Sequence, residues 1–326
     1  MKKIFLLLIL LVCYSSLYSV NPGSPLKIAE DLFNNSQYDE ALEIVNRELQ
    51  KDDFNIEARF IRGCILQVLS ENTKALEDVN IVLTYEPSNL EARYLRATIY
   101  SNIEDFENAL KDLNFILSIS PDETLALSLR GCLNSELGNY GEALIDLNNA
   151  IKNTYPNDPE ICKYYYNRAK IYYDMESYKL SLKDVEAALS YNYTDYKSLI
   201  LKALLLNILS ETGKAIDTIN YALVIYPAAY ELYLYRILFY LDSKKLDMAK
   251  NELDNLERSI KKSPNYHFLM AKYYASLGDK KNAIKELELC KKAKKDNDED
   301  MLFDVKITIE NGINTSLDDF NTSDLH

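Results

Sequence analysis

Arginine and aspartate recur at fixed positions along this chain, and they form its most regular pattern of charged side chains. The basic members of the pattern are Arg62, Arg96, Arg130, Arg168, Lys202 and Arg236. The residues that follow each of them at a constant spacing are Asp78, Asp112, Asp146, Asp184, Thr218 and Glu252, and Glu286 continues the series. Guanidinium and carboxylate groups could bind a charged ligand or pair with one another. Because the pattern is copied from one stretch to the next, we interpret it as a structural ladder of ion pairs.

The residues on which most enzymes depend are scarce in this sequence. Its two histidines are His267 and the terminal His326, so no histidine-based metal site or catalytic triad can be assembled within the chain. A glycine-rich phosphate loop is also absent. Four cysteines follow the N-terminal segment at spacings that match no metal site, and we expect them to pack as small apolar residues: Cys64, Cys132, Cys162 and Cys290. The sequence therefore predicts a protein without enzymatic activity, metal or cofactor.

The elements that position the arginines and aspartates are repeated units with a step of 34 residues. Each unit has a small anchor residue, and the anchors are Ala41, Ala75, Ala109, Ala143, Ser181, Ala215, Ala249 and Ala283. A four-residue insertion at Thr154–Pro159 interrupts the step once. A second small residue precedes the anchor by twelve positions in seven of the eight units, and apolar residues three and four apart mark two amphipathic helices per unit. Each unit is thus a helical hairpin that can bury its apolar stripe only against its neighbours.

In these phased units the sequence resembles the tetratricopeptide repeat family. The resemblance rests on eight units, and it departs from the family pattern at Glu48 in the first unit and at Ile237 and Lys250 in the seventh. It implies an all-α fold, a right-handed α-solenoid of helical hairpins wound into a tetratricopeptide-like superhelix. We divide the chain into a signal peptide (1–19), eight repeats (20–296), a capping helix (297–310) and an acidic disordered tail (311–326).

In this family the first helices of successive repeats line a concave groove that takes a peptide, and the resemblance implies the same surface here. The side chains that it places on this groove are Phe60, Tyr94, Thr98, Ser128, Tyr166, Lys170, Tyr173, Ile200, Leu204 and Asn207. We expect the aromatic members to stay open to water and to anchor a partner, with Lys170 and Asn207 fixing the register of its backbone. The alternatives are that these side chains only pack on neighbouring helices, or that the basic stretch Lys291–Lys295 binds the partner.

The first 19 residues have the layout of a secretory signal peptide. Met1–Lys3 is basic, Ile4–Val12 is an apolar run too short to span a bilayer, and Cys13–Ser19 is a short polar exit. We expect cleavage after Ser19 and export to the periplasm, the cell envelope or the medium. The processed chain would then not be an integral membrane protein. Acylation of Cys13, as in a lipoprotein, is the alternative.

Charge is distributed unevenly and argues against one class of partner. The net charge of −13 repels phosphate backbones, so we expect no nucleic-acid binding. Residues 243–295 hold 14 basic and seven acidic side chains, whereas residues 296–326 hold one and nine. With the predicted groove and signal peptide, the sequence favours an extracytoplasmic scaffold or assembly factor that holds a peptide segment of a partner protein. The alternative is a periplasmic or lumenal holdase chaperone for unfolded chains.

N-terminal sequencing of the protein from its native host tests the export prediction. Because the apolar run is short and a polar segment follows it, the mature chain should begin near Val20. Soluble cytoplasmic protein that retains Met1 would contradict export. Lipid attached to Cys13 would favour the lipoprotein alternative.

Overall fold

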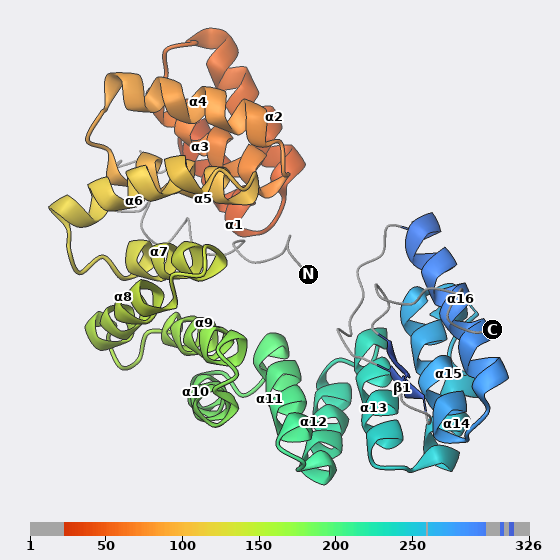
Figure 1. Ribbon diagram of the computed structural model, residues 1–326. Helices are drawn as coiled ribbons and strands as arrows, with labels where there is room; N and C mark the ends of the chain where they lie inside the picture. The colour runs from red at the N-terminus through yellow and green to blue at the C-terminus, as the bar shows by residue number, and fades with distance from the viewer. Residues whose placement is uncertain (1–22, 259, 298–306, 310–312, 316–326) are drawn as a thin grey trace. The chain divides into compact units, whose positions relative to one another are not determined.

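The computed structural model describes residues 23–258, 260–297, 307–309 and 313–315, and most of these are helical (Figure 1). The predicted signal peptide lies outside the described residues. The helices are α1 (Pro25–Asn34), α2 (Tyr38–Lys51), α3 (Ile56–Val68), α4 (Asn72–Tyr85), α5 (Leu90–Asn102), α6 (Phe106–Ile119), α7 (Thr124–Glu136), α8 (Tyr140–Asn153), α9 (Ile161–Asp174), α10 (Tyr178–Tyr191), α11 (Tyr196–Ile208), α12 (Thr212–Ile225), α13 (Tyr230–Asp242), α14 (Leu246–Asn255), α15 (Pro264–Ser276) and α16 (Lys280–Asn297). A 3-10 turn, η2 (Ile260–Lys262), precedes α15.

The described helices pair in chain order into eight hairpins, which confirms the predicted all-α solenoid. The turn inside each hairpin contains one residue with φ between 56° and 78°, and only two of these residues are glycine: Ser36, Ser70, Glu104, Gly138, Glu176, Ser210, Lys244 and Gly278. In the second hairpin the Glu71 N–H donates to the Leu66 carbonyl at 2.8 Å, and the Ser70 N–H donates to Gln67 at 3.0 Å. These bonds satisfy carbonyls left free at the end of the first helix, so each hairpin closes in the same way.

Small residues allow the two helices of a hairpin to approach closely. A Cβ added to Gly63 would lie 3.0 Å from Cγ2 of Val79, and one added to Gly131 would lie 3.1 Å from the Ala143 carbonyl oxygen. Both distances are too short for an ordinary carbon contact, so a larger side chain would push the helices apart. The seventh hairpin departs from this rule, since Ile237 occupies the corresponding position and is fully buried.

The chain divides into two compact units, residues 1–167 and 168–326, and each unit has its own hydrophobic core. Odd-numbered helices approach one another within a unit, as α3 approaches α5 and α13 approaches α15. Among the described elements, no two even-numbered helices make comparable contact. The odd-numbered helices therefore form the inner wall of each unit, and the even-numbered helices form its outer wall.

The expectation of a helix throughout residues 297–310 is wrong at Ile307–Ile309. This segment is a strand, β1, which pairs antiparallel with β2 (Ile313–Thr315) and contacts α15. The sequence explains the correction, because β-branched residues on both sides of an Asn-Gly pair favour a hairpin over a helix. Residues 298–306 and the predicted tail from 316 onward lie outside the described residues.

The predicted charge ladder forms, and each of its five arginines pairs with the acid of its own hairpin. The Arg96 guanidinium donates from Nε to Oδ2 of Asp112 at 2.7 Å and from Nη2 to Oδ1 at 2.9 Å. The same two-pronged pairing joins Arg62 to Asp78, Arg130 to Asp146, Arg168 to Asp184, and Arg236 to Glu252. The acids are almost fully buried, with side chains 2–12% exposed, so these pairs are shielded from solvent.

The guanidinium also reaches an asparagine of the preceding hairpin. Nη1 of Arg96 donates to Oδ1 of Asn80 at 2.8 Å, and equivalent bonds run from Arg62 to Asn46, from Arg130 to Asn114 and from Arg236 to Asn220. Each complete rung thus ties three helices of two hairpins together. The hydrogen bond to Asp112 raises the pKa of the Arg96 guanidinium above its usual value.

Replacing Arg96 with alanine should lower the free energy of unfolding by about 2–4 kcal/mol, because Asp112 would be left buried without its cation. Chemical denaturation followed by circular dichroism measures this change. Arg47→Ala is the matched control, since Arg47 and its partner Glu43 are 61% and 73% exposed and such pairs contribute about 0–1 kcal/mol. Equal losses in the two variants would contradict a buried ladder.

Candidate binding surfaces

The inner wall of the first unit is packed more tightly than the sequence suggested. Phe60 is 2% exposed, Tyr94 8%, Thr98 1% and Ser128 7%. The Thr98 hydroxyl donates to the Tyr94 carbonyl at 2.9 Å, and the Ser128 hydroxyl accepts from Asn167 at 3.2 Å. The expectation that these aromatic rings stay open to water is wrong for Phe60 and Tyr94, because neighbouring odd-numbered helices cover this part of the wall. The four residues build the wall and leave few atoms at its surface, whereas Tyr166 on α9 is partly exposed.

The inner wall of the second unit keeps partly exposed side chains at the predicted positions. They are Lys170, Tyr173, Ile200, Leu204 and Asn207. Ile200 and Leu204 rest on the core of this unit and present an aliphatic surface, and the Tyr173 ring packs edge-on against Tyr178 of α10.

Asn207 is hydrogen-bonded to other residues of the protein and has a structural role in the inner wall. Its amide nitrogen donates to Asp242 at 2.7 Å, and Asp242 also accepts from Lys272 at 2.7 Å. The Asn207 amide oxygen accepts from the Thr212 hydroxyl at 2.9 Å. This polar chain links α11, α13 and α15, so the Asn207 amide is already committed to holding neighbouring helices in register.

Two acidic residues of the first unit, Glu57 and Glu91, were missed by sequence reasoning. Each lies three positions before a predicted wall residue, Phe60 or Tyr94, and so shares its helix face. Both are half-buried, and no ion pair to either carboxylate occurs within the described part of the chain. Oε1 of Glu57 is buried and has no hydrogen-bond partner there. Burial is the main cause that raises the pKa of both carboxyls, and a nearby acid, Glu30, raises that of Glu57 further.

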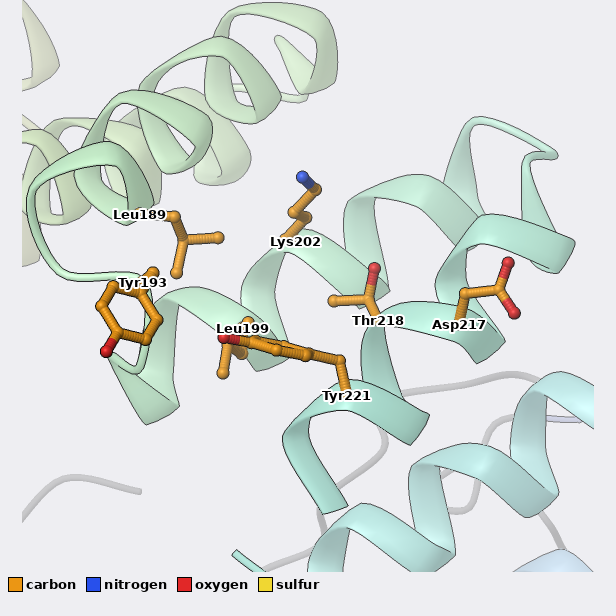
Figure 2. Close-up of a pocket in the computed structure, with 7 residues that line it drawn as sticks. All are labelled: Leu189, Tyr193, Leu199, Lys202, Asp217, Thr218 and Tyr221. Carbon is orange, nitrogen blue, oxygen red and sulfur yellow. The ribbon is translucent and has the colours of Figure 1, made fainter. Parts of the chain in front are cut away.

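A hollow of about 400 Å³ opens in the second unit between α10, α11 and α12. Figure 2 shows the residues that line it: Leu189, Tyr193, Leu199, Lys202, Asp217, Thr218 and Tyr221. The leucines and tyrosines gather on one side, Lys202 lies across from them, and Asp217 lies beyond Thr218 (Figure 2). Sequence reasoning did not predict the hollow, although Lys202 and Thr218 were visible as departures from the arginine and aspartate series.

The described residues offer little reactive chemistry. The four cysteines there are free thiols, and burial raises the pKa of Cys290 to about 11 and that of Cys64 further, so both stay protonated at neutral pH. No group of histidine, cysteine and acidic side chains in this part of the chain is arranged to hold a metal ion. No described helix is both long and apolar enough to cross a membrane.

Comparison with known proteins identifies the repeat. The tetratricopeptide repeat profile matches residues 90–123 and 264–297, which are the third and the eighth hairpins. No curated protein matches the sequence. Both matched hairpins have a left-handed residue in their turn, as the other six hairpins do, so the chain contains tetratricopeptide repeats.

Solved structures with the same fold share little sequence with this chain. The quorum sensor NprR from B. thuringiensis, in its apo form, superposes with a TM-score of 0.66 at 16% identity over 82% of this chain and 86% of its own. PilF from Pseudomonas aeruginosa gives 0.57 at 18% identity, over 67% and 96%. The APC/C hetero-tetramer Cut9-Hcn1 gives 0.61 at 16% identity over 87% of this chain, which spans only 55% of that chain. These likenesses establish the tetratricopeptide solenoid as the fold.

The double substitution Glu57→Gln and Glu91→Gln should raise the melting temperature at pH 7. Because the folded-state pKa of both carboxyls is raised, their ionised forms cost stability at neutral pH. This cost is present above the folded pKa and vanishes as the pH falls below the unfolded value of 4.5. Thermal denaturation at several pH values should therefore show a gain that shrinks towards pH 4. A gain that is constant with pH, or a loss at pH 7, would contradict the assigned shifts.

Proposed function

We propose that this chain of tetratricopeptide repeats is an exported scaffold protein that holds an extended segment of a partner protein against its inner wall. The layout of residues 1–19 supports export. The scarcity of histidine and the protonated state of the buried thiols favour binding over catalysis. The net charge of −13 favours a partner that is not a nucleic acid.

The observation that carries this proposal is the pair of half-buried carboxylates on the inner wall of the first unit. A carboxylate whose pKa is raised by burial stores unfavourable free energy, which an approaching cation relieves. Glu57 also has a buried oxygen that lacks a donor among the described residues. A bound segment with lysine or arginine would supply both the charge and the donor. The partner segment for the first unit is therefore basic.

The second unit supports contacts of a different kind. Ile200 and Leu204 are partly exposed on adjacent turns of α11, and each turn of a helix face can meet an apolar side chain of an extended segment. Apolar anchors of this sort carry much of the free energy in peptide recognition, while charged groups set specificity and association rate. Each unit thus contributes its own type of contact to the proposed scaffold.

An array of peptides from the exported proteins of the native host, probed with the purified mature chain, tests the proposal. Bound peptides should be enriched in lysine and arginine. For the strongest of them, the double substitution Glu57→Gln and Glu91→Gln should weaken binding roughly tenfold, which is about 1.4 kcal/mol, because two charge contacts are lost. Fluorescence anisotropy measures the affinity.

The matched control is Glu77→Gln with Glu142→Gln, which removes the same charge from exposed positions on the outer helices α4 and α8. Its affinity should stay within about twofold of the wild type, since exposed charges are screened by salt. If the control weakens binding as much as the inner-wall variant, only net charge matters and the wall is not the site. Unchanged binding in both variants would exclude this surface.

A further inference from the structure

The hollow between α10, α11 and α12 occupies the place where another hairpin buries an arginine. In the third hairpin the Arg93 guanidinium stacks 3.6 Å above the centre of the Phe115 ring. It donates to the carbonyl oxygen of Pro87 at 3.0 and 2.7 Å and to Asp112 at 2.9 Å. An aromatic face, a backbone carbonyl and a carboxylate therefore surround this guanidinium.

The same repeat positions recur 106 residues later, in the sixth hairpin, with one substitution that removes the guanidinium. Tyr221 stands where Phe115 stands, and the Tyr193 carbonyl corresponds to that of Pro87. Leu199 replaces Arg93, so the ring and the carbonyl remain while the guanidinium is gone. Tyr221 is 43% exposed and Tyr193 is 71% exposed, and both line the hollow (Figure 2).

Other hairpins show that this carbonyl is regularly satisfied by a donor. In the second hairpin Arg59 donates from Nε to the Asp53 carbonyl at 2.8 Å, and in the seventh the Tyr233 hydroxyl donates to Pro227 at 3.1 Å. Leucine at position 199 cannot donate, and none of the described hydrogen bonds ends on the Tyr193 carbonyl. The hollow thus lacks a donor as well as a cation.

The groups around the hollow favour a cationic occupant. The ladder rung here is reduced, because Lys202 and Thr218 stand in place of arginine and aspartate, and Glu186 stands at the position of Asn80 in the second hairpin. Lys202, the one cation among the residues that line the hollow, pairs with Glu186 at 3.1 Å. Its charge is therefore engaged, and the two tyrosine rings of the lining have faces that attract cations.

We infer that this hollow binds an arginine side chain presented by a partner protein. The methylene stem of the arginine packs on Leu189 and Leu199, the guanidinium lies on the Tyr221 ring, and its N–H groups donate to the Tyr193 carbonyl. Arginine suits the place better than lysine, because its planar group can stack on a ring and give two N–H groups to one carbonyl, as Arg93 does with Pro87. None of the residues that line this hollow is among those assigned to the inner wall, so the inference does not depend on the function proposed for that wall.

Titration of the full mature chain with the blocked tripeptide acetyl-Ala-Arg-Ala-amide tests the inference. Tyrosine rings carrying a carbon-13 label report binding by NMR, and Tyr→Phe variants assign the signals of Tyr193 and Tyr221. The arginine peptide should shift these two signals in a saturable way at millimolar concentration. The same peptide with citrulline, which has nearly the same shape but no charge, should bind at least fivefold more weakly.

Two variants locate the site. Tyr221→Ala removes an exposed ring and should weaken binding at least fivefold, whereas Tyr155→Ala removes an 82% exposed ring of the first unit and should leave it unchanged. Leu199→Arg with Thr218→Asp rebuilds the arrangement of Arg93 and Asp112 within the chain and should abolish binding of the peptide. If that buried substitution prevents folding, the tyrosine pair still decides the question.

Three results would overturn the inference. Equal binding of the citrulline peptide would show that the hollow takes an uncharged side chain. Shifts spread over tyrosines throughout the chain would show general attraction to an acidic surface. Undiminished binding to Tyr221→Ala would place the arginine elsewhere.

Discussion

Close approach of two helices at the anchor position is the constraint from which the rest of this structure follows. The fifth hairpin shows it directly, because its anchor is Ser181 and the buried hydroxyl donates to the Ala169 carbonyl on the facing helix at 2.7 Å. At this separation a hairpin has little interior of its own, and its apolar stripe remains open until the next hairpin covers it. The left-handed turn residue and the charge ladder both depend on the spacing that these small residues set. A hairpin with wider spacing would move the guanidinium away from its acid.

The ladder fixes how the helices of neighbouring hairpins are aligned along their axes. Hydrophobic contact alone would leave this alignment loosely specified. A guanidinium is planar, and its three nitrogens contact one acid and one asparagine, so a complete rung has little freedom to slide. The acids are nearly buried, which makes a broken rung costly although the net gain from a complete rung is modest. Where the rung is reduced, at Lys202 and Thr218, the single contact to Glu186 joins α11 to α10 but none of the described hydrogen bonds joins Lys202 to α12. The hollow lies at this point.

The sequence predicted the fold and the ladder well because both are properties of a repeat. A spacing that recurs eight times identifies hairpins, and residues equally far from a turn must face each other across it. Exposure could not be predicted in this way, since Phe60 and Tyr94 are covered by neighbouring odd-numbered helices whose separation no single repeat encodes. Glu57 and Glu91 could not be recognised in the sequence, which has 50 acidic residues, because only their burial sets them apart. The strand at Ile307–Ile309 departs from the expected helix because its β-branched residues and the Asn-Gly pair that follows favour a hairpin.

Binding surfaces in a repeat protein are to be sought where the repeat changes, because a side chain copied into every unit is already explained by packing. Arginine at the position of Arg93 completes a contact inside the third hairpin, and leucine at the same position in the sixth leaves an aromatic ring and a carbonyl exposed. A neutral residue at the Glu57 and Glu91 positions would avoid the cost of a half-buried charge, yet two successive hairpins carry the acid. In both places the residue stabilises the fold less than the residues found at the same repeat position in other hairpins of this chain. Groups left without a partner in this way are compensated only when another molecule supplies one, and for both surfaces the missing group is a cation with N–H donors.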